Sequence, residues 1–243
     1  MRNEHTSGTD LFMTTHWSVV RNARDGSDNT ATRQALSILC ENYWYPVYGY
    51  VRRRGNDAHR AEDLTQGFFL AFIEKDYLKS VSQDKGKFRA FLLASVKNYM
   101  ANVHDRETAQ KRGGGAAIVT LDSQLAEQLY KSAGTKTTSA DAVFDHEWAL
   151  TVLRTSQEVL RSEYEQAGKA EIFAALLHTM TIDDLGTSYQ DIAIKLSMSE
   201  SAVKVAAHRL RNRYRKHLRE AIGQTVSDNA FIDEELKYLI SCM

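Results

Sequence analysis

Apolar residues recur at a helical spacing along most of the chain. Stripes at intervals of three and four residues run through residues 34–54, 57–75 and 87–104, and resume from residue 144 onwards. One proline and 13 glycines leave few points at which a helix must end. Only residues 116–121 are strand-like, and that segment is short. The pattern therefore predicts an all-α fold.

The apolar stripes fall into two groups, separated by a stretch rich in glycine, serine and threonine. Residues 34–110 predict a three-helix bundle, and residues 144–223 predict a four-helix domain. Residues 111–143, which contain KRGGG and SAGTKTTSAD, predict a flexible linker because low hydrophobicity with clustered small residues favours mobility. This division leaves residues 1–33 as an N-terminal extension and residues 224–243 as a C-terminal tail with a short amphipathic stretch.

The most informative segment is residues 189–219, with the sequence YQDIAIKLSMSESAVKVAAHRLRNRYRKHLR. Its pattern predicts a helix over residues 189–196, a turn at Ser197 and Met198, and a long second helix capped by Ser199. This layout is typical of a helix-turn-helix, in which the second helix enters the major groove of DNA. The side chains expected to meet DNA are polar or basic for the most part: Ser199, Glu200, Ser201, Lys204, Val205, His208, Arg209 and Arg211.

Charge is unevenly distributed along a chain whose formal net charge is zero. Residues 85–112 hold seven lysines and arginines against two acidic residues, and residues 189–219 hold eight against two. The net charges of these zones, +5 and +6, leave −11 for the rest of the chain. Two basic zones in an acidic remainder favour two separate contacts with a polyanion over basic side chains that only solvate helix faces.

No residue pattern indicates a metal site or a catalytic site. Cys40 and Cys242 fit neither a zinc spacing nor a disulfide framework, and the eight histidines fit no motif such as HExxH. KRGGG lacks the lysine and hydroxyl ending of a phosphate-binding P-loop. We therefore expect no cofactor, no metal and no enzymatic activity. No apolar run approaches the roughly 20 residues of a membrane span, and no signal peptide is evident, so we expect a cytoplasmic protein without a membrane partner.

Three segments follow one another in a fixed order: AEDLTQGFFLAF at residues 61–72, GKFRAFLLASVKNYMANVHDR at 86–106, and the helix-turn-helix at 189–215. Together they resemble bacterial RNA polymerase sigma factors of the extracytoplasmic-function (ECF) type, which carry two domains called region two and region four. The resemblance implies a region-two-like bundle followed by a region-four-like domain. One departure lies in the turn, where Ser197 stands in place of the usual glycine and tolerates a positive φ less well.

The resemblance implies that the chain directs promoter recognition, DNA melting and transcription initiation, with RNA polymerase core and promoter DNA as partners. The second helix would bind the core through an acidic face and an exposed aromatic side chain, a combination that suits a basic partner surface. These residues are Glu62, Asp63, Gln66 and Phe69. An anti-sigma factor or another regulatory protein is left open as a further partner.

The third helix and the loop before it would hold the melted promoter strand. Cations would bind phosphates, while aromatic and amide groups would contact bases that have left the duplex. The residues that match this role are Lys85, Lys87, Phe88, Arg89, Lys97 and Asn98.

Two other functions fit parts of the sequence. A stand-alone helix-turn-helix transcriptional regulator, acting as a dimer on a palindromic operator, accounts for residues 189–219 but leaves the acidic and basic helices before them unexplained. An enzyme of nucleic-acid or nucleotide metabolism would need a site that no motif supplies. Co-purification with polymerase core separates a sigma factor from a regulator, and metal-dependent or nucleotide-dependent turnover would favour an enzyme.

Overall fold

A computed structural model describes much of the chain, in the ranges 16–17, 20, 30–73, 86–109, 127–128, 130, 139–180 and 188–243. Within these ranges every extended regular element is a helix. The β contact that they contain is an isolated antiparallel bridge between Lys87 and Val226. The predicted all-α fold is confirmed. None of the described helices combines the length and the hydropathy needed to cross a membrane.

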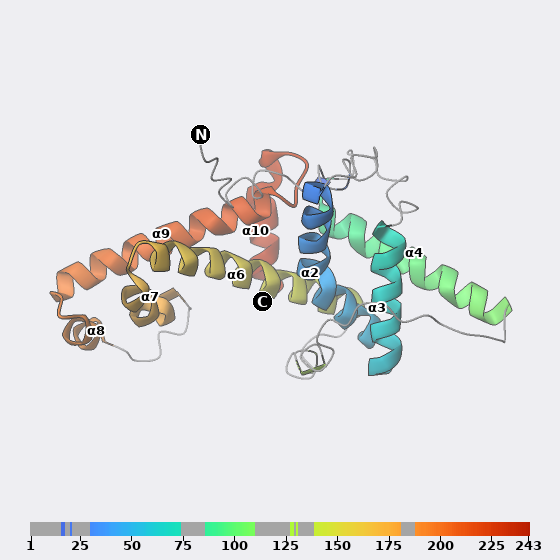
Figure 1. The fold of residues 1–243 in the computed structure, drawn as a ribbon, viewed down its shortest axis with the longest axis horizontal. Coiled ribbons are helices and arrows are strands. Elements are labelled where there is room, and N and C mark those ends of the chain that lie inside the picture. The colour runs from blue at the N-terminus through green and yellow to red at the C-terminus, as the bar shows by residue number, and fades with distance from the viewer. Residues whose placement is uncertain are drawn as a thin grey trace, which may run out of the picture. The chain divides into compact units, whose positions relative to one another are not determined.

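The chain divides into two compact units. Unit 1 comprises residues 1–151 and 223–243, and unit 2 comprises residues 152–222. Figure 1 labels the helices of both units along the chain. Each unit has its own buried apolar cluster and is described separately below.

Unit 1 begins with three helices close to the predicted positions: α2 (Thr30–Arg53), α3 (Ala58–Ile73) and α4 (Phe88–Ala109). Their shared core is aromatic. The ring of Phe88 lies 5.4 Å from Trp17, 5.4 Å from Tyr43 and 5.9 Å from Phe91, measured between centroids. The contacts with Trp17 and Tyr43 are edge-to-face, an arrangement that adds to the stability gained from burying the rings. Phe88 therefore fixes the start of α4 in the core of the unit.

Unit 1 also contains the first turns of α6 (Ala140–Gln166) and the C-terminal helix α10 (Ile232–Ser241). The chain before α10 runs beside the start of α4, because Phe88 N donates to Thr225 O at 2.8 Å and Ser227 N donates to Gly86 O at 2.9 Å. The C-terminal segment is thus bonded directly to the bundle.

This division differs from the predicted one at two places. Residues 144–151 and 224–243 were expected to lie outside the first bundle, yet both belong to unit 1. Their contacts are long-range: Arg89 is bonded to a residue 56 positions away in α6 and to another 146 positions away in α10. Residue spacing does not reveal such contacts. Of the predicted linker, the structure describes residues 127–128, 130 and 139–143, and the last four residues begin α6.

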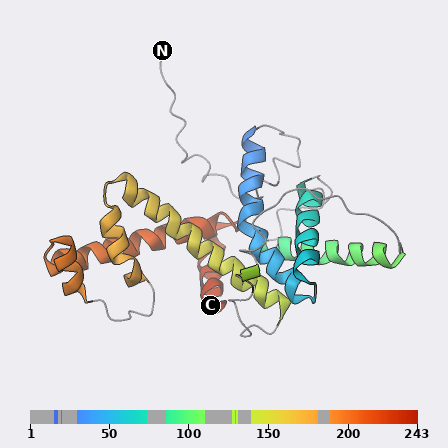
Figure 2. The ribbon, with the colours of Figure 1, turned by 60° about the horizontal axis from the view of Figure 1, so that its bottom comes forward.

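Unit 2 contains the rest of α6, then α7 (Ala170–Leu176), the 3-10 turn η5 (Leu177–Met180), α8 (Tyr189–Leu196) and nearly all of α9 (Glu200–Gly223). Figure 2 shows α8 at the N-terminal end of α9. The core of the unit is formed by apolar side chains from all four helices, among them Leu160, Phe173, Leu176, Ile192, Val203, Ala207 and Leu210. This core fixes the orientation of α8 relative to α9.

Candidate interaction surfaces

The turn between α8 and α9 has the geometry expected from the sequence. Ser197 adopts a left-handed backbone conformation, with φ 53° and ψ 41°. Its N–H donates to Ile194 O at 3.2 Å, and Met198 N donates to Ala193 O at 2.9 Å, so both N–H groups serve carbonyls at the end of α8. Ser199 Oγ accepts a hydrogen bond from Ala202 N at 3.3 Å and caps α9. The predicted pair of helices and the turn between them are confirmed.

The first turns of α9 present an open polar surface. Of the side chains expected to meet DNA, the structure leaves these exposed: Ser199, Glu200, Ser201, Lys204, Val205, His208 and Arg209. Lys204 Nζ lies 2.6 Å from Glu200 Oε1, and this hydrogen bond raises the pKa of Lys204. His208 Nε2 and Asn212 Nδ2 lie 2.9 Å apart on the same surface. The face that the pattern assigned to a partner is therefore not packed inside unit 2.

Arg211 departs from the prediction. It is half-buried, and its Nη1 donates to Thr179 O at 3.4 Å and to Tyr189 Oη at 3.3 Å. These contacts join α9 to η5 and α8. Because its guanidinium is directed at its own unit, Arg211 is a packing residue in this structure rather than part of the open surface.

The charge of α9 remains strongly positive along its length. The helix carries seven lysines and arginines against two glutamates. Arg209, Arg213, Arg215 and Arg219 are exposed, and Arg213 Nη1 also lies 3.4 Å from Glu163 Oε2 of α6. A helix with this charge attracts phosphates over several turns.

The acidic face of α3 matches the prediction in part. Asp63 is exposed, and Glu62 and Gln66 are half-buried, with Gln66 Nε2 donating to Glu62 Oε1 at 3.3 Å. Phe69 was expected to be exposed, and this was wrong. Its side chain is 5% exposed and its ring is stacked on Trp44, with the centroids 5.8 Å apart. Phe69 is therefore a core residue of unit 1.

Two apolar side chains on α3 that the prediction missed are exposed instead. Leu70 is 50% exposed and Ile73 is 42% exposed. They continue the face of Glu62 and Gln66 at intervals of four and three residues, so the four side chains form one stripe along the helix. The four-residue spacing after Gln66 was the signal that could have identified them. A stripe that begins with a carboxylate and an amide and ends in exposed apolar side chains is suited to binding another protein.

The structure buries some of the residues expected to bind a melted strand and leaves others exposed. Lys85 lies outside the described residues. Phe88 is fully buried in the aromatic core and cannot stack on a base in this state. Lys97 and Asn98 are exposed on α4, and Lys97 Nζ lies 2.6 Å from Asp141 Oδ2.

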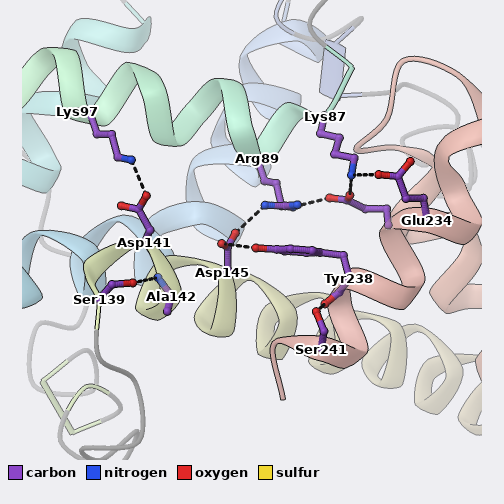
Figure 3. Close-up of polar contacts among 11 residues, drawn as sticks. Lys87, Arg89, Lys97, Ser139, Asp141, Ala142, Asp145, Glu234, Tyr238 and Ser241 are labelled. Carbon is purple, nitrogen blue, oxygen red and sulfur yellow. Dashed lines mark hydrogen bonds and ion pairs between the residues drawn. The ribbon is translucent and has the colours of Figure 1, made fainter.

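Arg89 is buried in an ion-pair network rather than exposed to a partner (Figure 3). Its Nε donates to Glu235 Oε1 at 2.5 Å, and its Nη1 donates to Asp145 Oδ1 at 2.7 Å. Its guanidinium also lies 3.8 Å from the ring centroid of Tyr238 and 5.1 Å from that of Trp148. The expectation that Arg89 is free to hold a phosphate is wrong for this state, because carboxylates occupy its donors.

Lys87 belongs to the same network. Its Nζ lies 2.7 Å from Glu234 Oε1 and 3.0 Å from Glu235 Oε2. Desolvation lowers the pKa of Lys87, but the hydrogen bonds to both glutamates outweigh it and the pKa is raised. Conversely, the hydrogen bond from Lys87 lowers the pKa of Glu234. Tyr238 Oη donates to Asp145 Oδ2 at 2.7 Å, which joins α10 to α6 (Figure 3).

The described part of the chain contains no group of three or more histidine, cysteine, aspartate or glutamate side chains that could hold a metal ion. Among the described residues, three exposed surfaces contain residues that were expected to contact a partner: the stripe on α3, the exposed part of α4 and the open face of α9.

One comparison with known proteins gives a match. Residues 40–109 match the family model described as Sigma-70 region 2. The matched segment covers the second half of α2 together with α3 and α4, which carry the first two surfaces. Neither a curated protein nor a solved structure matches the chain. The match supports a sigma-70 family factor, a class that acts with RNA polymerase core and promoter DNA.

Proposed function

We propose that the protein is a sigma factor of the ECF type, which binds RNA polymerase core and directs promoter recognition, melting and transcription initiation. The observation that carries the proposal is the match of residues 40–109 to Sigma-70 region 2. It is supported by a second compact unit that presents a basic helix after a tight turn. The site of action is the cytoplasm, where the polymerase works.

The polymerase core binds along the stripe on α3 and the neighbouring Asp63. Glu62, Asp63 and Gln66 supply hydrogen-bond acceptors and negative charge for a basic partner surface. Leu70 and Ile73 supply the apolar contact that is the usual source of affinity at the centre of an interface. The stripe is straight because it follows the spacing of one helix, so it suits an elongated partner such as another helix.

The helix α9 reads the upstream double-stranded promoter element as the second helix of a helix-turn-helix. Lys204, Val205 and His208 lie on its first turns, where the residues of such a helix reach the base edges. The glutamate paired with Lys204 is exposed, so phosphates can replace it. Arginines further along the helix meet the phosphate backbone.

The melted promoter strand binds beside α4. Of the described residues that were expected to bind this strand, Lys97 and Asn98 are exposed. Lys97 supplies a charge for phosphate, and Asn98 supplies an amide that can bond a base edge.

Run-off transcription with purified polymerase core tests the proposed function. Transcription start sites mapped after overexpression supply the promoter fragments. We expect the chain to bind core and to produce transcripts from these fragments that core alone does not produce. Absence of both core binding and promoter-directed transcripts would overturn the proposal. Binding to DNA without binding to core would indicate a stand-alone regulator instead.

A further inference from the structure

The cations at the start of α4 are held by carboxylates of the C-terminal segment. Glu235 is fully buried between Lys87 and Arg89. Glu234 bonds Lys87 from the surface (Figure 3). Asp145 of α6 bonds the other side of Arg89 at 2.7 Å. Under the proposed function, Lys87 and Arg89 belong to the surface that would bind the phosphates of the melted strand. Carboxylates therefore occupy the donors that phosphates would need.

The C-terminal segment has the charge of a competitor for such a surface. Residues 224–243 contain four acidic residues and one lysine. Three of the acidic residues, Asp233, Glu234 and Glu235, lie in the first turn of α10. Two of these carboxylates, Glu234 and Glu235, present closely spaced negative charge to Lys87 and Arg89, as a nucleic-acid backbone would.

Ion pairs of Glu234 and Glu235 form a large part of the attachment of α10, beside the burial of Leu239. Within α10, Glu235 and Leu239 are buried, whereas Ile240 is mostly exposed. The exposed pair of Lys87 and Glu234 weakens in salt and in the presence of a competing polyanion, whereas the buried pair of Arg89 and Glu235 is screened much less by salt. Release of α10 would expose Lys87, Arg89 and Glu235 to water. None of these charges would then remain buried without a counter-ion.

We propose that α10 is an intramolecular ligand of the strand-binding surface, and that promoter DNA displaces it. The carboxylates of α10 hold Lys87 and Arg89 in the free protein, and phosphates replace them when single-stranded DNA binds. This inference rests on the proposed function for the identity of the DNA, but the competition itself is a property of the free chain. A helix that is permanently bound to the bundle is the opposing interpretation.

Binding to single-stranded DNA measures the competition. The probe is a labelled thymidine oligonucleotide of about 16 nucleotides, and the variants are full-length chains. Glu234→Gln removes an exposed partner of Lys87, so we expect affinity to rise about two- to five-fold, the range of a surface ion pair. Glu165→Gln, which removes one exposed carboxylate from α6, is the matched control and should change affinity less. Adding Lys87→Ala to Glu234→Gln should abolish the gain.

Hydrogen exchange tests displacement directly. In the wild-type chain, the amides of residues 232–241 should exchange faster when the oligonucleotide is at saturating concentration, while those of α2 should not. If α10 stays equally protected and Glu234→Gln binds no more tightly than Glu165→Gln, α10 is a permanent part of unit 1 and the proposal is overturned.

Transcription separates this proposal from the proposed function. Wild-type chain and Glu234→Gln are compared with polymerase core in the same run-off assay. If neither binds core, the proposed function fails, and the exchange data on the free chain still decide whether α10 competes with DNA. If both transcribe to the same extent while α10 stays protected, the proposed function stands and the displacement of α10 does not.

Discussion

Ser197 holds a backbone conformation that glycine adopts more readily. It is the non-glycine residue with a positive φ among the described residues. The left-handed conformation costs an L-residue about 1–2 kcal/mol, and the extra backbone entropy of glycine in the unfolded chain offsets about 0.5–1 kcal/mol of that. We expect Ser197→Gly to raise the free energy of unfolding of unit 2 by about 0.5–1 kcal/mol, measured by urea denaturation.

Ser201→Gly is the matched control for this change, because Ser201 lies in the first turn of α9, where the backbone is helical. Glycine there should lower stability by about 0.3–0.5 kcal/mol, the difference in helix propensity between serine and glycine. Equal effects at both positions would contradict the argument from the positive φ.

His16 links the stability of unit 1 to pH. Its ring contacts the rings of Tyr43 and Phe88, with centroid distances of 5.7 Å and 5.3 Å, and burial lowers its pKa to about 4. An unfolded histidine has a pKa near 6.5, so between these values the unfolded chain binds a proton that the folded chain excludes. Stability is complete above pH 6.5 and falls as the pH drops towards 4, with a loss of about 2 kcal/mol at pH 5.

Urea denaturation at pH 7 and pH 5 measures this loss. His16→Met keeps an apolar side chain of similar size but cannot bind a proton. The difference in unfolding free energy between the two pH values should be about 2 kcal/mol smaller in this variant. The same difference in both proteins would show that other groups cause the pH dependence.

The role of Lys204 on α9 is best tested through the salt dependence of DNA binding. If it meets a phosphate, Lys204→Ala should weaken binding to promoter DNA and reduce the slope of log affinity against log salt by about one unit. Lys169→Ala removes the same charge at an exposed position before α7 and serves as the control. An unchanged affinity and slope for Lys204→Ala would remove this residue from the DNA interface.

At the scale of the helix, adjacent residues of α3 have different roles: one packs in the core and the next is exposed to a partner. Leu70 and Phe69 are adjacent, yet Leu70 is half exposed and Phe69 is buried against Trp44. Leu70→Ala should lower affinity for polymerase core roughly 5- to 30-fold, or about 1–2 kcal/mol, with little loss of stability. Phe69→Ala should lower the free energy of unfolding by about 3–5 kcal/mol.

The control for Leu70 is Ile38→Ala, which truncates a similarly exposed side chain on α2. Core binding by the purified variants and their urea denaturation provide the two readouts. Loss of core affinity in Ile38→Ala as large as in Leu70→Ala would show that the stripe on α3 is not the specific contact.

The helices that the sequence predicted well are those specified by local signals. The range of α8 was predicted to the residue, because its apolar spacing ends at Ser197 and Ser199 caps the next helix. The error at Phe69 has a different origin. A helix in contact with neighbours on two sides buries a wider arc than one stripe, and the pattern of α3 alone does not indicate the contact with Trp44.

Long-range polar contacts explain why the strand-binding site was predicted less well. A basic residue next to an aromatic residue at the start of a helix has the same sequence pattern whether it binds DNA or a carboxylate. The burial of Arg89 depends on Asp145 and Glu235, which are far away along the chain. Only the folded arrangement shows that the acidic tail and the basic helix neutralise each other.

At the scale of the molecule, the two units have separate cores, and the proposed function gives each a separate partner. Leu176 is fully buried in the core of unit 2, together with Ile192 of α8 and Val203 of α9. Leu176→Ala removes buried apolar contacts and should destabilise that core by about 2–5 kcal/mol. Binding to double-stranded promoter DNA should then be lost near the temperature at which unit 2 unfolds.

Polymerase core should still bind this variant, because α3 and its supporting aromatic residues lie in unit 1. A pull-down with core and a gel-shift assay with promoter DNA, performed over the same range of temperature, provide the comparison. Leu92→Ala, which truncates a fully buried leucine in unit 1, should give the reverse order of loss. If both variants lose both activities together, the units fold as one cooperative body, and the assignment of one partner to each unit has to be abandoned.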